Sequence, residues 1–182
     1  DLVAVARSLP DVGQDYSLEQ PDVQFNWRHN PVQLPKQTSA DLMWWLGLYI
    51  GDGFIHHEGE KARVEFAIPE TDQPLRTELK QVTSRLFDSP AQNGDPYRLT
   101  VGSSIIARYL EVNGFSGGAL EKRVPDWIAS LPQEQILAFI GGYVDADGYV
   151  RDHAKNKDVV LTSANIELLQ DVSELAAVCG VN

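Results

Sequence analysis

Two aspartates occupy the same place in two similar stretches of this chain. Asp52 comes near the end of the stretch from Trp45 to Gly53, and Asp147 comes 95 positions later, near the end of a matching stretch. Paired carboxylates bind divalent cations, because Mg²⁺ prefers oxygen ligands. Metal ions held in this way activate water and stabilise the leaving oxygen of a phosphodiester. The repeated aspartate therefore predicts a metal-dependent hydrolytic site.

Each aspartate follows an apolar run that carries small residues at helical spacing. Gly47 and Gly51 are four positions apart, as are Gly142 and Ala146. Small residues at this spacing allow two helix backbones to approach closely. Glycine inside a helix is unfavourable by about 1 kcal/mol relative to alanine, so several of them indicate a packing requirement. We therefore expect two helices to pack side by side with their aspartates at one end.

Electrostatics at such an end favour a bound cation. An aspartate at a helix C-terminus faces the negative end of the helix dipole, and two neighbouring aspartates repel each other. A divalent ion relieves both effects, with the last helical carbonyls of Gly51 and Ala146 as further metal ligands. Asp145 is the weaker candidate, because Ile50 takes its place in the first stretch.

The elements that follow each aspartate also repeat. The first helix is expected from an N-cap at Thr38 or Ser39, with Gly53 as its terminator. Alternation and helical spacing predict the remaining elements: a strand over 63–68, a helix over 75–86, a turn over 93–96, a strand over 97–101, a helix over 103–110, a helix over 132–146, strands at 149–150 and 159–162, and a helix over 166–179. The fold expected is α+β, with two pseudo-symmetric αββαββα halves of which the second is truncated.

Composition sets the broad class of the protein. The chain of 182 residues is 43% hydrophobic and has no initiator Met, so we expect a piece excised from a longer polypeptide. No run reaches the roughly 20 apolar residues of a membrane span, and no signal peptide is visible. Cys179 is the one cysteine of the chain and is expected to be a buried thiol. A single cysteine excludes a disulfide framework and favours a cytoplasmic location. Residues 1–37 are expected to form a connector, 38–128 the first repeat and 129–182 the incomplete second repeat.

Charge is distributed unevenly along the chain. The net charge of −11 argues against a nucleic-acid partner, but local distribution matters more than the sum. Basic residues follow both aspartates, and either segment taken alone is equally well explained as a solvated strand of mixed charge. The candidate DNA-binding residues are His56, His57, Lys61, Arg63, Arg98, Arg151, His153, Lys155 and Lys157.

The two motifs, at residues 44–54 and 139–150, resemble those of the LAGLIDADG homing endonucleases, in particular the type carried inside inteins. Leu34-Pro35-Lys36 and Lys122-Arg123-Val124-Pro125, which precede the motif helices, also look like that family. The resemblance implies that the motif helices pack at a pseudo-twofold axis and that the flanking sheets form a saddle over duplex DNA. It implies that Asp52 and Asp147 bind two or more Mg²⁺ ions and that Lys122 assists water activation. From the residues alone, Lys122 is also consistent with a surface lysine near a turn, and its counterpart in the second repeat would lie beyond Asn182.

The start of the chain, from Asp1 to Arg7, resembles the end of an intein's N-terminal splicing region. We therefore expect the parent chain to be continuous with intein splicing segments, although the splicing residues themselves are not present. The function expected is metal-dependent cleavage of both strands of a specific DNA site by a monomer that has no membrane partner. Two alternatives remain: a DNA-binding or structural domain that has lost its nuclease activity, and an RNA maturase with the same fold.

Overall fold

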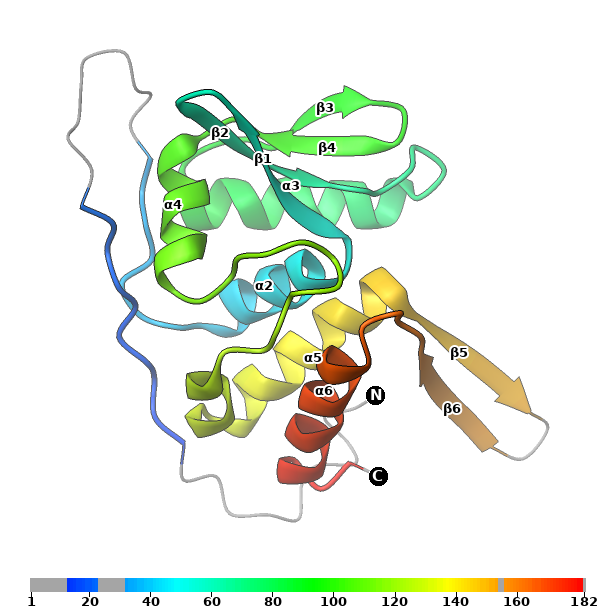
Figure 1. Cartoon of the computed structure of the whole chain (residues 1–182). Coiled ribbons are helices and arrows are strands. Elements are labelled where there is room, and N and C mark those ends of the chain that lie inside the picture. The colour runs from blue at the N-terminus through cyan, green and yellow to red at the C-terminus, as the bar shows by residue number, and fades with distance from the viewer. Residues whose placement is uncertain (1–12, 23–31, 154–155, 182) are drawn as a thin grey trace.

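The computed structural model describes residues 13–22, 32–153 and 156–181 and has a mixed α+β fold (Figure 1). Helices and two-stranded units follow one another in the repeating order that the sequence predicts. The elements are α2 (Ala40–Asp52), β1 (Gly53–Glu58), β2 (Lys61–Phe66), α3 (Gln73–Phe87), β3 (Gln92–Asp95), β4 (Arg98–Val101), α4 (Ser104–Val112), a 3₁₀ turn η1 (Asp126–Ser130), α5 (Gln133–Asp147), β5 (Gly148–His153), β6 (Asn156–Leu161) and α6 (Ile166–Val178).

Helices α2 and α5 lie side by side at the centre of the molecule (Figure 1). A Cβ atom on Gly47 would overlap the carbonyl oxygen of Phe139, and one on Gly142 would overlap that of Trp44. Further along the same contact, a Cβ on Gly51 would overlap the side chain of Ala146. The small-residue stripe thus brings the two backbones into direct contact, as its spacing predicts.

The first half is a four-stranded antiparallel sheet in the order β1-β2-β4-β3, packed against α3 and α4. Its core is aromatic: the Trp45 ring meets those of Phe66 and Phe87 edge-on, each with centroids 5.1 Å apart. The buried indole N–H of Trp45 donates to Thr83 Oγ1 at 2.8 Å. These contacts join the middle of α2 to the inner face of the sheet and to α3.

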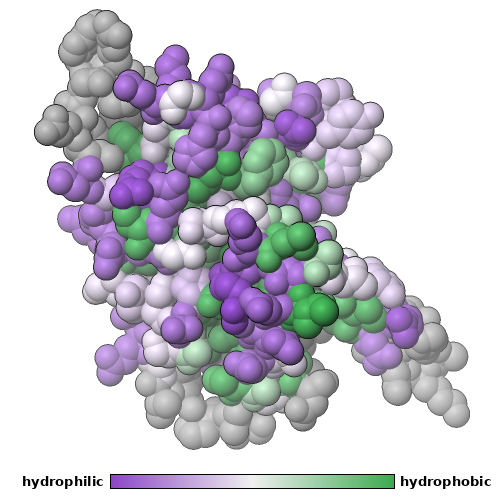
Figure 2. Space-filling model, viewed as in Figure 1, coloured by the Kyte–Doolittle hydropathy of each residue, from purple (hydrophilic) through white to green (hydrophobic). Residues whose placement is uncertain are grey.

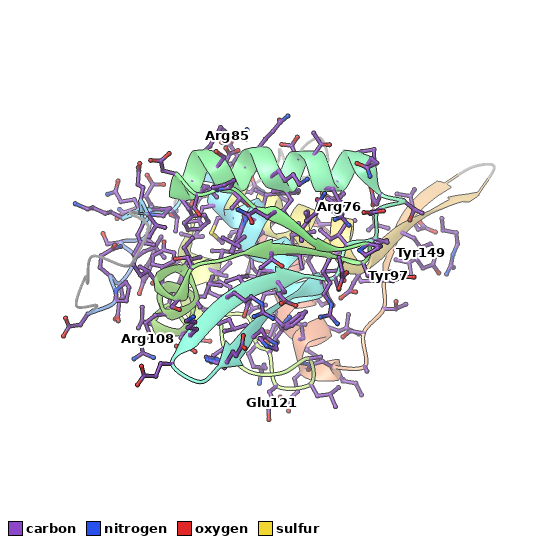
Figure 3. The ribbon with its side chains drawn as sticks, turned by 90° about the horizontal axis from the view of Figure 1, so that it is seen from above. Arg76, Arg85, Tyr97, Arg108, Glu121 and Tyr149 are labelled. Atoms are coloured by element: carbon purple, nitrogen blue, oxygen red, sulfur yellow. The ribbon has the colours of Figure 1, made fainter. Side chains whose placement is uncertain are left out.

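Helix α3 presents different arginines to the sheet and to solvent. From above, Arg76 points towards the strands, whereas Arg85 lies on the outer side of the helix (Figure 3). Arg76 is buried, and its guanidinium donates to the carbonyl oxygens of Ile68 at 2.6 Å and Arg98 at 3.2 Å. This arginine therefore fixes the backbone where the β3–β4 hairpin meets α3.

The second half begins as a copy of the first. β5 pairs with β6 from Gly148↔Leu161 onward, and β1 pairs with β2 from Gly53↔Phe66 onward, so the two registers differ by the same 95 positions as the motifs. β2 has β4 on its other edge, whereas β6 pairs only with β5 within the described residues. Hydrophobic residues accordingly reach the surface along this hairpin (Figure 2), and Val159 is 44% exposed where its counterpart Val64 is fully buried.

The described part of the expected connector is extended and docked. Residues 13–22 run past both halves: Gln14 N donates to Ser130 O, and Glu19 exchanges backbone hydrogen bonds with the Asn113 side chain at 2.9 Å. An isolated bridge joins Ser17 to Gln37. The short strand expected near residue 2, and the Asp1 to Arg7 stretch, lie outside the described residues. The domain boundaries at residues 37 and 128 stay predictions.

One local expectation was wrong. Residues 93–95, expected to begin a turn, belong to strand β3, which pairs with β4 through an irregular register. Gly53 ends α2 as expected, and its backbone is extended with φ −87°. Glycine is needed there because a Cβ would overlap the Tyr49 side chain as the strand leaves the helix. The other expected elements are confirmed within two residues at each end, apart from the strands of the second half: β5 ends three residues after 150, and β6 begins three residues before 159.

None of the described helices is long and apolar enough to cross a membrane.

Candidate metal centre and nucleic-acid face

The two motif aspartates lie together at the C-terminal ends of α2 and α5. Asp52 and Asp147 are the last residues of their helices, and both are partly buried. Asp147 Oδ2 lies 3.3 Å from the position that a Cβ on Gly51 would occupy, so this carboxylate reaches across to the opposite helix. The close helix contact made by the small residues thus places both carboxylates at one site, as the sequence predicts.

Burial and mutual repulsion make this pair hold protons unusually tightly. Burial, together with the smaller effect of the nearby Asp147 carboxylate, raises the pKa of Asp52 to about 7. Lys122 acts in the opposite direction. Burial also raises the pKa of Asp147, again against the effect of Lys122. Two carboxylates that resist ionisation without a cation suit a divalent ion, whose charge would offset both causes. The residues present therefore fit a Mg²⁺ or Mn²⁺ ion.

Lys122 is buried directly against this site, so the surface-lysine interpretation is wrong. Its ammonium donates to the carbonyl oxygens of Tyr49 at 3.0 Å and Ile50 at 2.9 Å, and also to that of Gly53. It also lies 5.1 Å from the centre of the Tyr49 ring. Burial lowers its pKa to about 8, although both aspartates act in the opposite direction. All three ammonium protons thus cap the end of α2.

The C-terminal carbonyls of α2 are divided between this lysine and the sheet. Lys122 occupies those of Tyr49, Ile50 and Gly53, and Ala67 N–H donates to Asp52 O at 2.9 Å. The carbonyl of Gly51 takes part in none of these contacts. Among the described residues, no group of three His, Cys, Asp or Glu side chains is placed to hold a metal. A cation would therefore need oxygen ligands beyond the two carboxylates, such as backbone carbonyls.

Asp145 lies apart from this pair, in agreement with its lower ranking. Its Oδ2 accepts a 2.8 Å hydrogen bond from the Trp44 indole. Asp145 lines a cleft of about 520 Å³ whose other acidic residues are Asp41, Asp72 and Glu78. The carboxylate two positions before Asp147 thus serves a different surface of the molecule.

The candidate DNA-binding residues of the first half do not all share a face. Side chains alternate along a strand, and Val64 and Phe66 point into the core. His56, Lys61, Arg63 and Arg98 consequently lie on the outer face of the sheet. His57 pairs with Ala62 on the inner side, and its Nε2 lies 3.4 Å from Glu111 on α4. His57 is therefore separated from the other four by the strand alternation.

Arg151 is the one predicted residue of the second half whose side chain is described. It lies on β5 opposite Asp158, donates to the Tyr149 hydroxyl at 3.1 Å and stands 6.0 Å from the centre of that ring. Lys155 lies outside the described residues, as do the side chains of His153 and Lys157.

Two residues of this surface were missed in the sequence. Glu65 is buried on the outer face between Arg63 and Arg98, and Tyr149 supports Arg151. The alternation of strand 63–68 placed Glu65 on the same face as Arg63, so the signal was present. Charge-based selection of basic residues overlooked the carboxylate that holds them.

Comparison with known proteins agrees with the α+β fold. Residues 134–182 match the model of the LAGLIDADG-like domain. The fold is similar to that of a chain in the crystal structure of I-DmoI in complex with DNA and Mn, with a TM-score of 0.50, 21% identity and 76% of each chain covered. The likeness to I-DmoI is one of fold.

Similar curated proteins have unrelated names. An iron–sulfur cluster assembly SufBD family protein of Mycobacterium leprae is 35% identical over 98% of this chain, which covers 20% of that protein. A DNA polymerase of Thermococcus hydrothermalis is 30% identical over 85% of this chain and 9% of its own length. A replication factor C small subunit of Methanocaldococcus jannaschii is 27% identical over 74% of this chain and 7% of its own length. The chain thus spans a fifth or less of these relatives.

Proposed function

We propose that this chain, whose residues 134–182 match the LAGLIDADG-like domain, is a DNA endonuclease domain. It would hydrolyse both strands of a specific duplex with divalent metal ions. The observation that carries this proposal is the meeting of Asp52 and Asp147 at the joined ends of α2 and α5. Burial raises the pKa of both carboxylates, and Asp147 adds to the increase at Asp52, so a bound cation would offset these effects. Perturbed carboxylates at such a junction are typical of functional sites.

Each residue of the site has a distinct role in this proposal. Asp52 and Asp147 provide the carboxylate oxygens, and the Gly51 and Ala146 carbonyls complete the proposed ligand set. A bound Mg²⁺ or Mn²⁺ supplies positive charge that polarises a phosphodiester and lowers the pKa of water. Lys122 holds the end of α2 in place through its three carbonyl contacts, and its positive charge lies close to both aspartates.

The outer faces of the two sheets provide the proposed DNA surface. Both β1 and β5 start at the residue after a motif aspartate, so each sheet extends directly from the aspartate pair. His56, Lys61, Arg63 and Arg98 lie on the first sheet and Arg151 lies on the second. Arginine and lysine contact phosphates and read guanine edges. One chain contributes both aspartates, so we propose that a monomer suffices.

We further propose that this domain is an insertion of the intein type within a longer protein. The relatives share a segment that covers 7–20% of their lengths, while their names are those of an iron–sulfur cluster assembly protein, a DNA polymerase and a replication factor C small subunit. The recurrence of one segment in proteins of unrelated activity indicates a segment that moves between host proteins. This origin also agrees with the resemblance of the Asp1 to Arg7 stretch to a splicing region.

A cleavage assay tests the nuclease proposal. The substrate is a supercoiled plasmid carrying the uninterrupted host coding sequence, incubated with the chain and Mg²⁺ or Mn²⁺. We expect D52N and D147N each to lower the cleavage rate by at least about a hundredfold, since each removes a metal-binding carboxylate. D145N is the matched control, because it changes an exposed carboxylate of the same helix that contacts Trp44.

The opposite outcomes are equally clear. If D52N and D147N both cleave at the wild-type rate, the metal site is elsewhere. If the wild-type chain binds the plasmid but never nicks it with either metal, the domain is a DNA-binding protein without nuclease activity.

A further inference from the structure

Glu65 is a buried carboxylate on the sheet face that carries Lys61, Arg63 and Arg98. It lies on β2 directly across from Phe54 on β1, and only 3% of the residue is exposed. An isolated buried carboxylate is strongly unfavourable unless it is paired and hydrogen bonded. Its neighbours along the strand, Val64 and Phe66, point the other way into the core. The partners that compensate Glu65 must therefore lie on the outer face.

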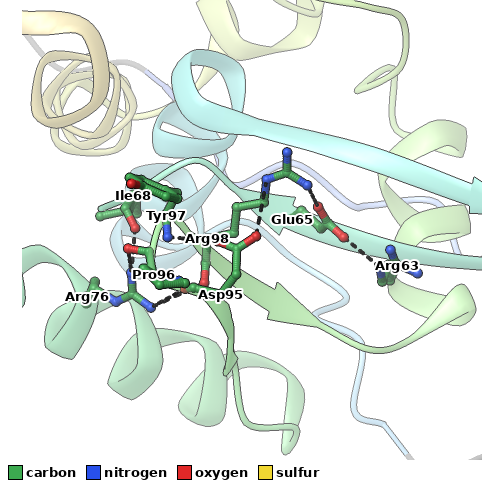
Figure 4. A network of polar contacts seen from close by, with 8 residues as sticks. All are labelled: Arg63, Glu65, Ile68, Arg76, Asp95, Pro96, Tyr97 and Arg98. Atoms are coloured by element: carbon green, nitrogen blue, oxygen red, sulfur yellow. Dashed lines mark hydrogen bonds and ion pairs between the residues drawn. The ribbon is translucent and has the colours of Figure 1, made fainter. Parts of the chain in front are cut away.

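Those partners are two of the proposed DNA-binding arginines (Figure 4). Arg63 Nε donates to Glu65 Oε1 at 2.6 Å, and Arg98 Nη1 donates to Glu65 Oε2 at 3.3 Å. Each carboxylate oxygen thus holds one guanidinium, and the two guanidiniums come from different strands. Glu65 joins β2 to β4 through side chains at the centre of the sheet.

Further contacts hold Arg98 in place. Its guanidinium lies 5.7 Å from the centre of the Phe54 ring, and its backbone carbonyl accepts from the buried Arg76 at 3.2 Å. Arg63 Nη1 also reaches Glu58 at 3.3 Å, but the Glu58 side chain is 73% exposed, and such an ion pair contributes too little to hold the guanidinium. Within the described residues, Nη2 of Arg63 and Nη2 of Arg98 donate no hydrogen bond. Both arginines therefore keep N–H groups available for a ligand while their planes are held by the protein.

We propose that Glu65 is a positioning residue for DNA sequence specificity, which fixes Arg63 and Arg98 so that their free N–H groups read base edges. This inference rests on the proposed function. A free arginine side chain loses rotamer entropy when it binds, and a guanidinium fixed beforehand loses less. Bidentate contact with guanine also needs a defined guanidinium plane, whereas phosphate contact tolerates several. A fixed arginine pair thus favours recognition of sequence over general attraction.

The arrangement belongs to one half of the molecule. The position on β6 that corresponds to Glu65 is Val160, and Asp158 stands where β2 has Arg63. Glu65 therefore supports specificity on one side of the DNA site only.

Selection from a randomised duplex library tests this inference. The chain is used as wild type, E65Q and E58Q, without metal to prevent cleavage, and the affinities for the enriched and a scrambled duplex are then compared. E58Q is the matched control, because it removes the same charge from the same face and its side chain is 73% exposed. The melting temperature of each variant is recorded alongside.

We expect E65Q to reduce the affinity ratio between enriched and scrambled duplexes by roughly five- to a hundredfold, the range that one or two base contacts contribute. The loss should be confined to one side of the selected sequence. Affinity for the scrambled duplex should stay the same or rise, because a negative charge leaves the DNA face. E58Q should show the same rise but keep the ratio.

Each contrary result has a distinct meaning. If E65Q keeps the ratio within twofold, or loses affinity for both duplexes together with thermal stability, Glu65 is a structural residue and the inference is wrong. The same follows if the loss is spread evenly over the site or if E58Q matches E65Q. A wild-type chain that enriches no sequence would overturn the proposed function and the inference together.

Discussion

At the scale of single residues, the site consists of buried and partly buried charged groups of opposite sign, each of which would be unfavourable if it were buried alone. Asp52 and Asp147 are brought together at the negative ends of two helices. Lys122 is buried beside them, and its ammonium donates hydrogen bonds to backbone carbonyl oxygens. The lysine satisfies the end of α2 and lessens the repulsion between the aspartates. The two carboxylates still hold protons more tightly than usual, which is the basis of the proposed metal affinity.

Lys122 should contribute strongly to folding. K122M keeps the length of the side chain but leaves three buried carbonyl oxygens without this donor, and each unsatisfied group is unfavourable by about 1–3 kcal/mol. We expect the free energy of unfolding in urea to fall by at least about 2 kcal/mol. K61M, at an exposed strand position, should change it by less than about 0.5 kcal/mol. A K122M chain as stable as wild type would show that the carbonyls find other donors.

Asp52 should make the metal-free chain less stable as the pH rises. Its pKa is raised from the ordinary 3.8 to about 7 in the folded chain. The stabilisation due to protonated Asp52 is therefore complete below pH 3.8 and is lost as the pH rises through 7. D52N removes this loss, so in EDTA it should melt above wild type at pH 8, with the gap narrowing steadily as the pH is lowered towards 4.

Added Mg²⁺ provides the complementary measurement. Wild type at pH 8 should gain melting temperature, because a ligand that binds only the folded state stabilises it, and D52N should gain less. D145N should behave as wild type in both measurements. Equal melting temperatures of wild type and D52N in EDTA at pH 8 would contradict the effect of burial and of Asp147 on the Asp52 carboxyl.

At the scale of elements, the pairing of α2 with α5 sets the geometry of the site. Gly47, Gly142 and the Gly51–Ala146 contact bring the helices together, and each helix then runs directly into a strand. Any increase in the spacing between the helices would separate the carboxylates. The helix interface and the metal centre therefore depend on the same small residues.

Two adjacent glycines of α5 test this dependence. A Cβ at Gly142 would overlap the Trp44 carbonyl oxygen, whereas one at Gly141 meets no atom within 4 Å. We expect G142A to lower the free energy of unfolding by at least about 2 kcal/mol, because the overlap is with backbone. G141A should raise it by up to about 1 kcal/mol through helix propensity. Similar urea midpoints for the two variants would indicate that the helices can separate without loss.

At the scale of the whole molecule, the distribution of charge matters more than its sum. The chain has a net charge of −11, yet Lys61, Arg63 and Arg98 share the outer face of the first sheet. Acidic residues such as Asp41 and Glu78 line the cleft beside α3. The same fold thus separates a cationic surface from an acidic one.

This separation predicts different effects for two equal changes in net charge. E58Q, on the sheet face, should increase affinity for random duplex DNA at 50 mM salt by about two- to fivefold, because it lies within a Debye length of the proposed DNA surface. E78Q, in the cleft, should change it by less than about 1.5-fold. Raising the salt to 200 mM should weaken binding of all variants and reduce the difference between them. Equal effects of E58Q and E78Q would place the DNA elsewhere.

The sequence by itself determined the repeat, the elements and the two aspartates. These follow from local patterns: alternation for the strands, helical spacing of small residues for α2 and α5, and a shared position for Asp52 and Asp147. Local patterns also placed Asp145 second, because the first motif has Ile50 there. The pseudo-symmetric α+β fold could be predicted because both copies carry the same periodicities.

Only the tertiary structure decided what each charged side chain faces. Lys122 lies about 70 positions from the carbonyls it caps, so no local pattern shows that it is buried. Pairing with β2 places His56 beside Arg63 and His57 beside Ala62, and Glu65 gains Arg98 as its second arginine partner only when β4 pairs with β2. Burial and charge pairing depend on contacts between distant segments, which is why composition indicated an acidic chain while the fold assembled a cationic face beside a carboxylate pair.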